Sequence, residues 1–407
     1  MTRRLYYTDS FLYEFDAAVC EVASGGRPAV ILDQTAFYPT SGGQVFDTGW
    51  IEAGGEKLRV TEVAEDEQGT IVHYIDAAAS LAPGTRVRGT IDAPRRRDHM
   101  QQHSGQHVLS AAFVRLFAMP TVSFHMGEES CTIDLQARLL APAQLDEAGR
   151  LANRVITDDR PVEVSFASLE EARALGVRKL PEVQREKLRL VDIRDFDLTA
   201  CGGTHVRSTG QIGPILLRKT ENVRQGVRVE FVCGERAVGA AQRDHTTLVE
   251  AAAAFSAHIS DLPQQVRKAQ AELKAAQKAQ QKLLEDLAEL SAARLVADAP
   301  LCHREGKTFR LVTKVFPDRD TAFLKLLAQK IAAAGPAVAL VASTSDAPSL
   351  VFCQTPELPF NMGELLKQVL AAAGGRGGGA RDFAQGSLPD AAQVDAALRQ
   401  AISSIAP

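Results

Sequence analysis

The stretch that decides the fold is residues 92–117, which read DAPRRRDHMQQHSGQHVLSAAFVRLF. Asp92 followed closely by Pro94 is a typical helix start, because aspartate caps free N–H groups and proline fits the first turn. The pattern therefore predicts a helix from about residue 93 to the end of this stretch. His103 and His107, four positions apart, would lie on one helix face with Cβ atoms about 5–6 Å apart, so they can share one metal ion.

The segment before this helix, residues 1–90, is predicted to be rich in β-structure. Short apolar runs alternate with turn signals in AVILDQTAFYPTSGGQVFDTGWI (29–51). TIVHYID (70–76) and RVRGTID (86–92) are typical of further strands. We expect a β-barrel or a compact sandwich.

The second predicted domain, residues 91–240, combines the first helix with strands and a further helix near 143–158. The strands are expected at VSFHMG (122–127), CTIDL (131–135), VEVSFASL (162–169), LRLVDI (188–193), PILLRKTENV (214–223) and VRVEFVCG (227–234). This mixture indicates an α+β domain whose sheet ends near Gly234.

The third predicted domain, residues 241–300, is an alanine-rich helical stalk. Residues that recur at alternating intervals of three and four positions predict a coiled-coil seam. They are Val266, Ala269, Leu273, Ala276, Gln280, Leu283, Leu287 and Leu290. Pro263 is expected to separate this helix from an earlier one at 243–259. Both two antiparallel helices and a dimeric coiled coil fit the pattern.

The fourth predicted domain, residues 301–407, is of the α/β type. Strands are expected at FRLVTKVF (309–316), AVALVAST (337–344) and LVFCQ (350–354), and helices near 319–334, 361–373 and 390–404. The glycine-rich stretch GGRGGGARDFAQG (374–386) is expected to form a loop between the last two helices. Its backbone N–H groups could hold a phosphate, although it does not follow a strand as a dinucleotide fingerprint does.

The composition is that of a globular chain without a general preference for nucleic acid. The 407 residues are 45% hydrophobic and 24% charged, with a formal net charge of −4. Nucleic-acid binding would therefore need local basic patches. The candidates, each of which can also be a solvated charged face, are Arg95 to Arg97, then Arg185, Lys187 and Arg189, and then Arg218, Lys219, Arg224 and Arg228.

The cysteines and the apolar runs favour a cytoplasmic protein. Six irregularly spaced cysteines do not form a disulfide framework. The N-terminus lacks an apolar signal core, and no apolar run is long enough to cross a bilayer. We expect reduced thiols and no membrane association.

A second motif, CGGTH at residues 201–205, complements the two helix histidines. A thiolate and an imidazole are good zinc ligands, and four such donors make a tetrahedral site. Taken alone, Cys201 can also be a buried apolar residue and the histidines can be surface groups. Four protein ligands are typical of a structural site, whereas catalytic zinc keeps a position open, and the sequence does not choose. Ser104 stands where zinc proteases of the HExxH type have glutamate, which argues against that class.

These motifs together resemble the editing domain of alanyl-tRNA synthetases, and more closely the free-standing alanyl-tRNA editing proteins of the AlaX type. The resemblance rests on HSGQH, on DLTACGGTHVRSTGQIG (197–213) and on TAFYPTSGGQVFDTG (35–49). The stretch GGRGGGARDFAQG is similar to the synthetase C-terminal domain, so the resemblance covers essentially the whole chain. Since the barrel begins within the first forty residues, we expect no aminoacylation domain and no ATP-dependent charging.

The resemblance implies hydrolysis of the ester that joins serine, or glycine, to tRNA(Ala), with Ala-tRNA(Ala) spared. It implies one zinc ion per chain, held by His103, His107, Cys201 and His205. Thr35 matches the family position that recognises the serine hydroxyl, and Gln44 lies in the same motif. A site built to bind that hydroxyl rejects the analogue that lacks it.

The remaining expected roles concern the reacting groups and the RNA. Gly202 and Gly203 could offer N–H groups to an oxyanion, while Gln44, Gln106 and Asp98 are candidates for holding the attacking water. RNA contact is expected at Arg218, Lys219, Arg228 and Arg376. Mischarged tRNA(Ala) is the expected partner, and a homodimer could form through residues 264–295 or the C-terminal domain.

Two other functions fit the same residues. One is a tRNA-binding or assembly protein whose zinc is only structural and which has no esterase activity. The other is a zinc hydrolase of small esters or amides, which would not need the C-terminal third of the chain.

Overall fold

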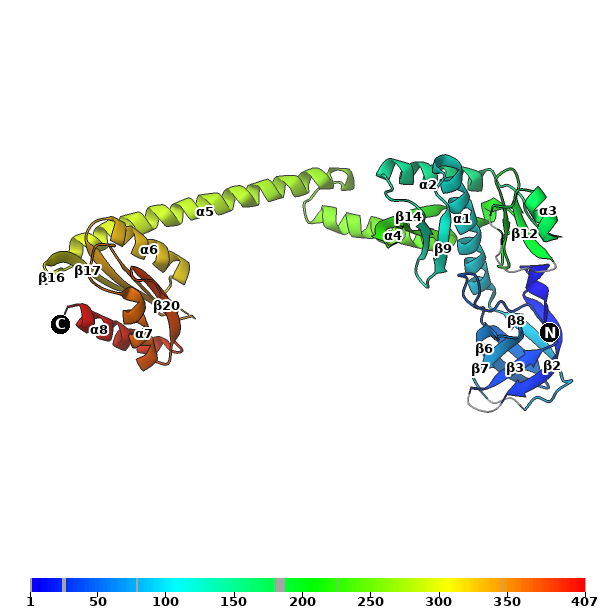
Figure 1. The fold of residues 1–407 in the computed structure, drawn as a ribbon, viewed down its shortest axis with the longest axis horizontal. Helices are drawn as coiled ribbons and strands as arrows, with labels where there is room; N and C mark the ends of the chain where they lie inside the picture. Colours follow the sequence, from blue (N-terminus) through cyan, green and yellow to red (C-terminus); the bar gives the residue numbers. More distant parts are fainter. Residues whose placement is uncertain are drawn as a thin grey trace. The chain divides into compact units, whose positions relative to one another are not determined.

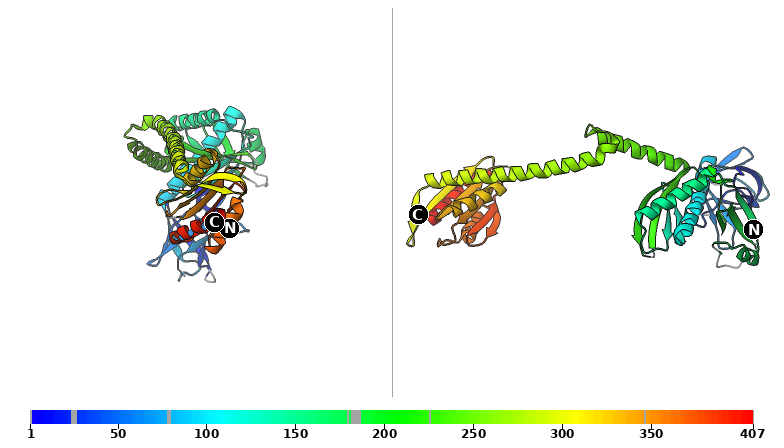
Figure 2. Two further views of the ribbon diagram at one scale, coloured as in Figure 1. Left: turned by 90° about the vertical axis from the view of Figure 1, so that its left-hand side faces the viewer. Right: turned by 90° about the horizontal axis from the view of Figure 1, so that it is seen from above.

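The computed structural model describes residues 2–23, 27–77, 80–178, 180, 187–224, 226–345 and 347–406. The chain divides into two compact units, residues 1–251 and 252–407. Figures 1 and 2 show the elements of each unit. Arg185, one of the predicted basic residues, lies outside the described residues. Among those that are described, none of the helices combines the length and apolar character needed to cross a bilayer.

The first unit begins with a closed six-stranded β-barrel, which confirms the prediction of a barrel. Its strands, in order around the barrel, are β2 (Glu14–Ala23), β3 (Ala29–Leu32), β7 (Ile71–Ile75), β6 (Glu56–Glu65), β5 (Gly49–Ala53) and β8 (Arg86–Ile91). Alternate side chains point inward, so that Val30, Ile51, Val60 and Ile71 are fully buried. Beside the barrel, β1 (Arg3–Arg4) pairs in parallel with β4 (Gln34–Thr35).

A long buried helix, α1 (Ala93–Phe117), follows the barrel. Its start is as predicted, because the Asp92 carboxylate accepts a hydrogen bond from the Arg95 N–H group and Pro94 lies in the first turn. It packs against α2 (Pro142–Thr157) and contacts a four-stranded antiparallel sheet. The order of that sheet is β14 (Ile215–Val223), β15 (Gly226–Cys233), β10 (Cys131–Leu135) and β9 (Thr121–Met126).

A smaller antiparallel sheet carries the second motif. It is formed by β11 (Val162–Ala167), β12 (Leu188–Ile193) and β13 (Asp197–Ala200), with α3 (Leu169–Ala174) against it. The CGGTH motif begins directly after β13, so the end of this strand fixes where Cys201 lies.

The last helix of the first unit, α4 (Gly234–Ala253), does not have the predicted bounds of 243–259. It begins directly at the end of β15 because Ala237 and Ala240 are buried against Val232. The chain then turns out of the helix, where Ser256 has a φ of 49°. The predicted antiparallel pairing with the next helix concerns two different units and stays a prediction.

The second unit is a mixed sheet with helices on both faces. The sheet order is β16 (Leu301–Arg304), β17 (Lys307–Phe316), β18 (Ala337–Ser343), β19 (Ser349–Gln354), β21 (Phe383–Ser387) and β20 (Arg376–Gly379). One face packs on α5 (Leu262–Asp298) and α6 (Thr321–Ala333), and the other on α7 (Met362–Ala372) and α8 (Val394–Ile405). Strand β18 is buried along its whole length for this reason.

The predicted coiled-coil seam is not the face by which α5 packs in this unit. Leu284, Ala288 and Ala292 pack with residues of α6, whereas Leu283 and Leu290 of the seam are 68% and 72% exposed. Small alanine side chains allow a neighbouring helix to come close, which explains the choice of face. Assembly through the seam stays a prediction.

The glycine-rich stretch is an edge hairpin and not the predicted loop. Strand β20 pairs with β21, and α7 lies against both. A Cβ atom on Gly377 would lie 2.4 Å from the Cα atom of Gly386. The glycines are therefore needed for close packing of backbones, which single-sequence propensity does not reveal.

Candidate metal centre

Four side chains from two distant parts of the first unit meet at one point. His103 and His107 come from α1, and Cys201 and His205 come from the loop after β13. One ligand atom from each lies within 4.8 Å of the other three. The histidines are 3–5% exposed, and Cys201 is half-buried. The structure thus brings together the two motifs that were predicted to meet.

The loop 201–205 is held by a buried cation. Arg189 in β12 donates from Nη1 to the carbonyl oxygens of Cys201, at 2.7 Å, and Gly203, at 3.0 Å. Its Nε donates to the carbonyl of Tyr7 at 2.9 Å. Arg189 therefore has a structural role in shaping the loop, and it is not a solvated residue of a basic patch.

Gly203 is required by a close approach to the first histidine. A Cβ atom there would lie 2.1 Å from Cε1 of His103, which no side chain can accommodate. The Gly203 N–H group donates to Sγ of Cys201 at 3.4 Å. This N–H was expected to serve an oxyanion, and the structure directs it at the sulfur instead. Gly202 is exposed beside it.

Gln44 from the N-terminal motif fixes the orientation of His103. Its Oε1 lies 2.7 Å from Nδ1 of His103 and accepts the backbone N–H of Thr204 at 3.1 Å. Its Nε2 donates to Oγ1 of Thr204 at 2.8 Å. An amide oxygen that accepts from Nδ1 leaves Nε2 of His103 free of its proton and turned toward the cluster.

The other two histidines have partners at Nδ1 as well. Nδ1 of His205 lies 3.2 Å from Oγ of Ser104. Nδ1 of His107 lies 3.8 Å from a carboxylate oxygen of Asp197, which is an ion-pair distance and not a hydrogen bond. Arg178 in turn binds Asp197 at 2.6 and 2.9 Å. Such outer partners fix the tautomers of metal-binding histidines.

The electrostatics favour a thiolate in this cluster. Burial alone would raise the pKa of the Cys201 thiol, but the imidazole rings of His103, His205 and His107 beside it outweigh burial and hold the pKa well below its usual range. Burial lowers the pKa of His205 to about 3, so this imidazole is neutral. Burial also opposes the charge on His107, yet the Cys201 thiolate and Asp197 raise its pKa to about 9.

The distances within the cluster fit a metal ion of the size of zinc. Zinc bonds of about 2.3 Å to sulfur and 2.0–2.1 Å to nitrogen, at a tetrahedral angle, separate the two ligand atoms by about 3.6 Å. Sγ of Cys201 lies 3.5 Å from Nε2 of His103 and 3.3 Å from Nε2 of His205. Three nitrogens and one sulfur suit zinc chemically. The residues present can therefore hold such an ion.

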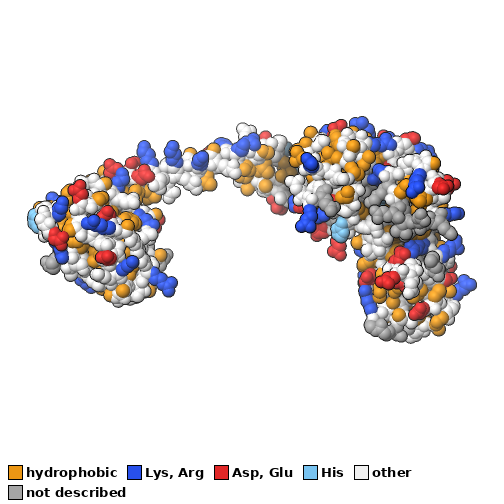
Figure 3. Space-filling model, in the orientation of Figure 1, with side chains coloured by type: hydrophobic (Ala, Val, Ile, Leu, Met, Phe, Trp, Pro, Cys, Tyr) orange, Lys and Arg blue, Asp and Glu red, His pale blue; other side chains and the backbone are white. Residues whose placement is uncertain are grey.

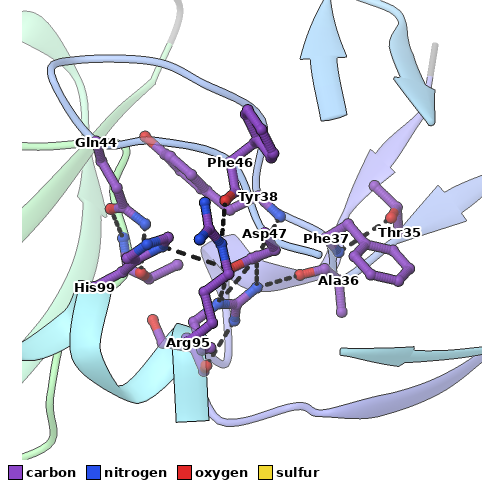
Figure 4. Close-up of polar contacts among 12 residues, drawn as sticks. Thr35, Ala36, Phe37, Tyr38, Gln44, Phe46, Asp47, Arg95 and His99 are labelled. Atoms are coloured by element: carbon purple, nitrogen blue, oxygen red, sulfur yellow. Dashed lines mark hydrogen bonds and ion pairs between the residues drawn. The ribbon is translucent and has the colours of Figure 1, made fainter. Parts of the chain in front are cut away.

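The N-terminal motif is anchored by an ion pair that sequence reasoning missed. Asp47 (Figure 4) is fully buried and paired with Arg96, which is fully buried as well. Arg96 also donates to the carbonyls of Ser10, at 2.7 Å, and Ala36, at 2.6 Å, while the N–H of Tyr38 donates to Asp47 at 2.7 Å. Arg96 was expected in a basic patch or a solvated face, and burial excludes both. The one sequence feature that could have indicated this pair is the position of Asp47 within the motif at 35–49.

Thr35 is fully buried against the barrel strand β7 and lies away from Gln44 of the same motif (Figure 4). Its hydroxyl lies 2.8 Å from Nε2 of His73, whose Nδ1 lies 3.0 Å from the carbonyl of Val30. Nδ1 must carry the proton, so the Thr35 hydroxyl donates to Nε2. Its oxygen also accepts the N–H of Phe37 at 3.1 Å, which leaves it one lone pair.

The two other polar candidates bind neighbours outside the cluster. The side-chain amide of Gln106 donates to Ser110 at 2.8 Å. Asp98 forms a two-bond ion pair with Arg236, at 2.6 and 2.8 Å. These contacts give both residues structural roles.

The predicted RNA-binding cations differ in their surroundings. Arg218 pairs with Asp244, Lys219 lies 3.2 Å from Glu221, and Arg228 lies 2.7 Å from Asp134. Arg376 is exposed in β20. Figure 3 shows basic and acidic side chains interspersed over the face that it draws. The neighbouring carboxylates partly neutralise Arg218, Lys219 and Arg228, so the attraction of these three cations for a phosphate is weakened.

Comparison with known proteins relates three segments of the chain to tRNA synthetases and to the DHHA1 domain. Residues 5–95 match the family of class II (A) tRNA synthetases, and residues 188–229 match the second additional domain of threonyl and alanyl tRNA synthetases. Residues 312–406 match the DHHA1 domain. The alanine–tRNA ligase of Pyrococcus abyssi is 32% identical in an alignment of 410 positions that covers 98% of this chain. The ligase of Archaeoglobus fulgidus is 33% identical in an alignment of 394 positions that covers 95% of this chain.

The chain is similar to alanyl-tRNA synthetases over almost its whole length. The resemblance to alanyl-tRNA editing proteins is thereby confirmed. The chain spans 43% of the Pyrococcus abyssi ligase and 42% of the Archaeoglobus fulgidus ligase. The C-Ala domain of Aquifex aeolicus alanyl-tRNA synthetase, a solved structure, is 25% identical over 26% of this chain and 98% of that domain, with a TM-score of 0.22.

Proposed function

We propose that this protein hydrolyses the aminoacyl ester of mischarged Ser-tRNA(Ala), and of Gly-tRNA(Ala), and spares Ala-tRNA(Ala). The observation that carries the proposal is the buried cluster of three histidines and one cysteine, of which Cys201 and His205 lie in the segment that matches the second additional domain of threonyl and alanyl tRNA synthetases. One zinc ion per chain would be held by His103, His107, Cys201 and His205. Zinc there would supply Lewis-acid polarisation of an ester carbonyl.

The chain's own residues position the reacting ester. Gln44 and Ser104 fix the rings of His103 and His205, while the half-buried Cys201 forms the side of the cluster that faces a cavity. The Gly203 N–H group stabilises the sulfur charge, so oxyanion stabilisation must come from elsewhere. Because these groups are already in place, the ester can bind without their rearrangement, which accelerates hydrolysis.

Discrimination against alanine is assigned to Thr35 and Gln44 in the N-terminal motif. Gln44 bonds His103 of the cluster and has one side-chain N–H left that can donate to a serine hydroxyl. An alanyl ester lacks the hydroxyl and leaves that N–H unpaired, which costs free energy. Thr35 is fully buried and bonded to His73 and Phe37, so its contribution would come through the shape of the motif that carries Gln44. A Thr35→Val variant that still distinguishes Ser-tRNA(Ala) from Ala-tRNA(Ala) as well as the wild type does would remove Thr35 from this role.

The alternative is a tRNA-binding or assembly protein whose metal is structural. It is favoured by the complete four-donor set, which is typical of closed sites. Single-turnover deacylation of Ser-tRNA(Ala), with Ala-tRNA(Ala) in parallel, separates the two. We expect rapid loss of serine and retention of alanine, and loss of activity in a Cys201→Ala variant that keeps the barrel folded. Intact Ser-tRNA(Ala) in the presence of bound RNA would favour the alternative.

The proposed setting is the cytoplasm, with tRNA(Ala) as partner. The six cysteines are free, as a reducing compartment requires. The exposed leucines of α5 support a homodimer through residues 264–295. Equilibrium sedimentation of the full chain and of a Leu283→Lys, Leu290→Lys variant tests that assembly.

A further inference from the structure

The two metal-binding histidines share α1 with a second row of residues that packs elsewhere. This row, with intervals of three and four positions, consists of Asp98, Gln101, Gln102 and Gly105. At about 3.6 residues per turn, His103 and His107 lie on the other side of the helix. The contacts of the row therefore set the depth and the rotation at which α1 presents both histidines to the loop with Cys201.

The row packs against the corner at which β15 ends and α4 begins, residues 233–236. Gln102 is fully buried there and binds both backbone groups of Cys233. The N–H of Cys233 donates to Oε1 of Gln102 at 2.9 Å, and Nε2 of Gln102 donates to the Cys233 carbonyl at 3.0 Å. Because strand β10 begins opposite Phe231, earlier in β15, the glutamine takes the place of a strand partner.

Arg236 provides the second contact between the corner and the row. It binds the Asp98 carboxylate through two hydrogen bonds, of 2.6 and 2.8 Å, and donates to the carbonyl of Gly127 at 2.7 Å. The arginine and aspartate side chains are only 16% and 27% exposed, so water screens this ion pair less than a pair on the surface. One guanidinium group thus connects α1, α4 and the turn between β9 and β10.

Two glycines bring the helix and the corner into direct contact. A Cβ atom on Gly105 would lie 2.3 Å from Sγ of Cys233, and one on Gly234 would lie 2.2 Å from Oε1 of Gln101. Gly234 also has a φ of 57°, which favours glycine. Surfaces packed this closely leave α1 no room to turn or slide toward the corner.

The two halves of the metal cluster are held by separate parts of the first unit. Arg189 of β12 fixes the loop that carries Cys201 and His205, through its hydrogen bonds to two loop carbonyls. His107 depends on α1 itself, because its Nδ1 makes no hydrogen bond to any residue that the structure describes. The four ligands can therefore meet only if α1 is held as firmly as the loop.

We propose that Gln102 and Arg236 are positioning residues of the metal centre. They act through α1, because they fix the depth and the rotation of this helix and thereby the places of His103 and His107. The inference rests on the part of the proposed function that assigns a metal ion to the cluster. It gives neither residue a part in ester cleavage itself.

The test uses the full chain, freed of metal and then titrated with Co²⁺ or Zn²⁺. Bound Co²⁺ absorbs visible light according to the geometry of its ligands, so its spectrum reports the arrangement of the cluster. Arg236→Gln is compared with Arg4→Gln, which is a matched control. Arg4 binds Glu65 through two hydrogen bonds, of 2.6 and 3.1 Å, and donates to the carbonyl of Gly69 at 3.2 Å. These side chains are 16% and 28% exposed, and the pair joins β1 to the end of β6.

We expect Arg236→Gln to bind both metals about 3- to 30-fold more weakly, as is usual for residues that act on a site without touching it, and Arg4→Gln to stay within about twofold of the wild type. The visible spectrum of bound Co²⁺ should change in Arg236→Gln alone, while the urea midpoints of both variants should fall by similar amounts. Arg236→Lys keeps the positive charge and should recover most of the metal affinity. Gln102→Met keeps the size of the side chain without its hydrogen bonds, so its metal affinity should fall as in Arg236→Gln.

Equal metal affinities and identical Co²⁺ spectra of Arg236→Gln and Arg4→Gln would overturn the inference. A failure of the proposed function gives a different result. A wild type that takes up neither metal removes the metal centre, and this inference with it. If the wild type binds metal but leaves Ser-tRNA(Ala) intact, the esterase proposal falls, while a weaker and spectrally altered Arg236→Gln still establishes the positioning role.

Discussion

Replacement of Gln44 by alanine is the perturbation that best tests how the metal cluster is built. The substitution removes three polar contacts, of 2.7 Å to His103 and of 2.8 and 3.1 Å to Thr204. His103 then loses the acceptor that fixes its tautomer, and the buried N–H of Thr204 is left unpaired. Loss of such an outer partner typically costs 10- to 100-fold in metal affinity, or about 1.4–2.7 kcal/mol. The unpaired N–H group costs a further 1–3 kcal/mol of folding stability, by typical values.

The assay is competition for zinc against a chromophoric chelator at pH 7.5, together with urea unfolding of the metal-free protein. Gln106→Ala is the matched control, since this glutamine is also buried but bonds to Ser110. It should lose some stability without any loss of zinc affinity. Equal zinc dissociation constants for the Gln44 and Gln106 variants would refute the assignment of Gln44 as the residue that orients His103.

Three further perturbations have outcomes that follow from the structure. Gly203→Ala should abolish stoichiometric zinc binding, because its Cβ atom would lie 2.1 Å from the ring of His103. Gly202→Ala, whose Cβ atom would have its nearest neighbour 3.5 Å away, should bind zinc normally. Similar zinc contents of the two variants by mass spectrometry would contradict the required close approach at Gly203. Asp47→Ala leaves the fully buried Arg96 unpaired and should lower the free energy of unfolding by about 3–5 kcal/mol. An unchanged midpoint of urea unfolding would show that the Asp47–Arg96 pair does not stabilise the fold. Burial lowers the pKa of His73 to about 4, so between pH 6.5 and 4 only the unfolded chain takes up this proton, and the free energy of unfolding falls by about 3 kcal/mol on acidification. A His73→Gln variant should have a shallower pH dependence of stability over that window, and parallel curves would show that this histidine is not responsible.

The elements that sequence reasoning predicted well are those with local signals. The helix at 93–117 has its aspartate cap and early proline, and the barrel strands have alternating apolar residues between turns. The hairpin at 376–387 was missed because glycines are typical of loops, while here they allow backbone contact that depends on distant packing. The start of α4 was missed because burial against β15 decides it.

The residues of the candidate site also fall into those that the sequence predicts and those that only the structure reveals. The four cluster residues could be named because cysteine and histidine at such spacings carry their chemistry in their identity. The outer partner Asp197 and the Asp47–Arg96 pair could not be named, because each is a common residue type whose role comes from a neighbour far along the chain. Thr35 was proposed from a family resemblance, and its bond to His73 could not be anticipated from the sequence.

The separation of the cluster's two halves along the chain sets an order of events during synthesis. His107 precedes Cys201 by 94 positions, which corresponds to about 5–20 s at ordinary translation rates. Over that interval the cluster has two of its imidazoles and not its thiolate, and these two donors bind zinc much more weakly than the complete set. Loading with metal must therefore follow the release of residues 201–205, after the barrel has been made. A chelator present during synthesis should leave a folded, metal-free barrel that recovers its cluster when zinc is returned.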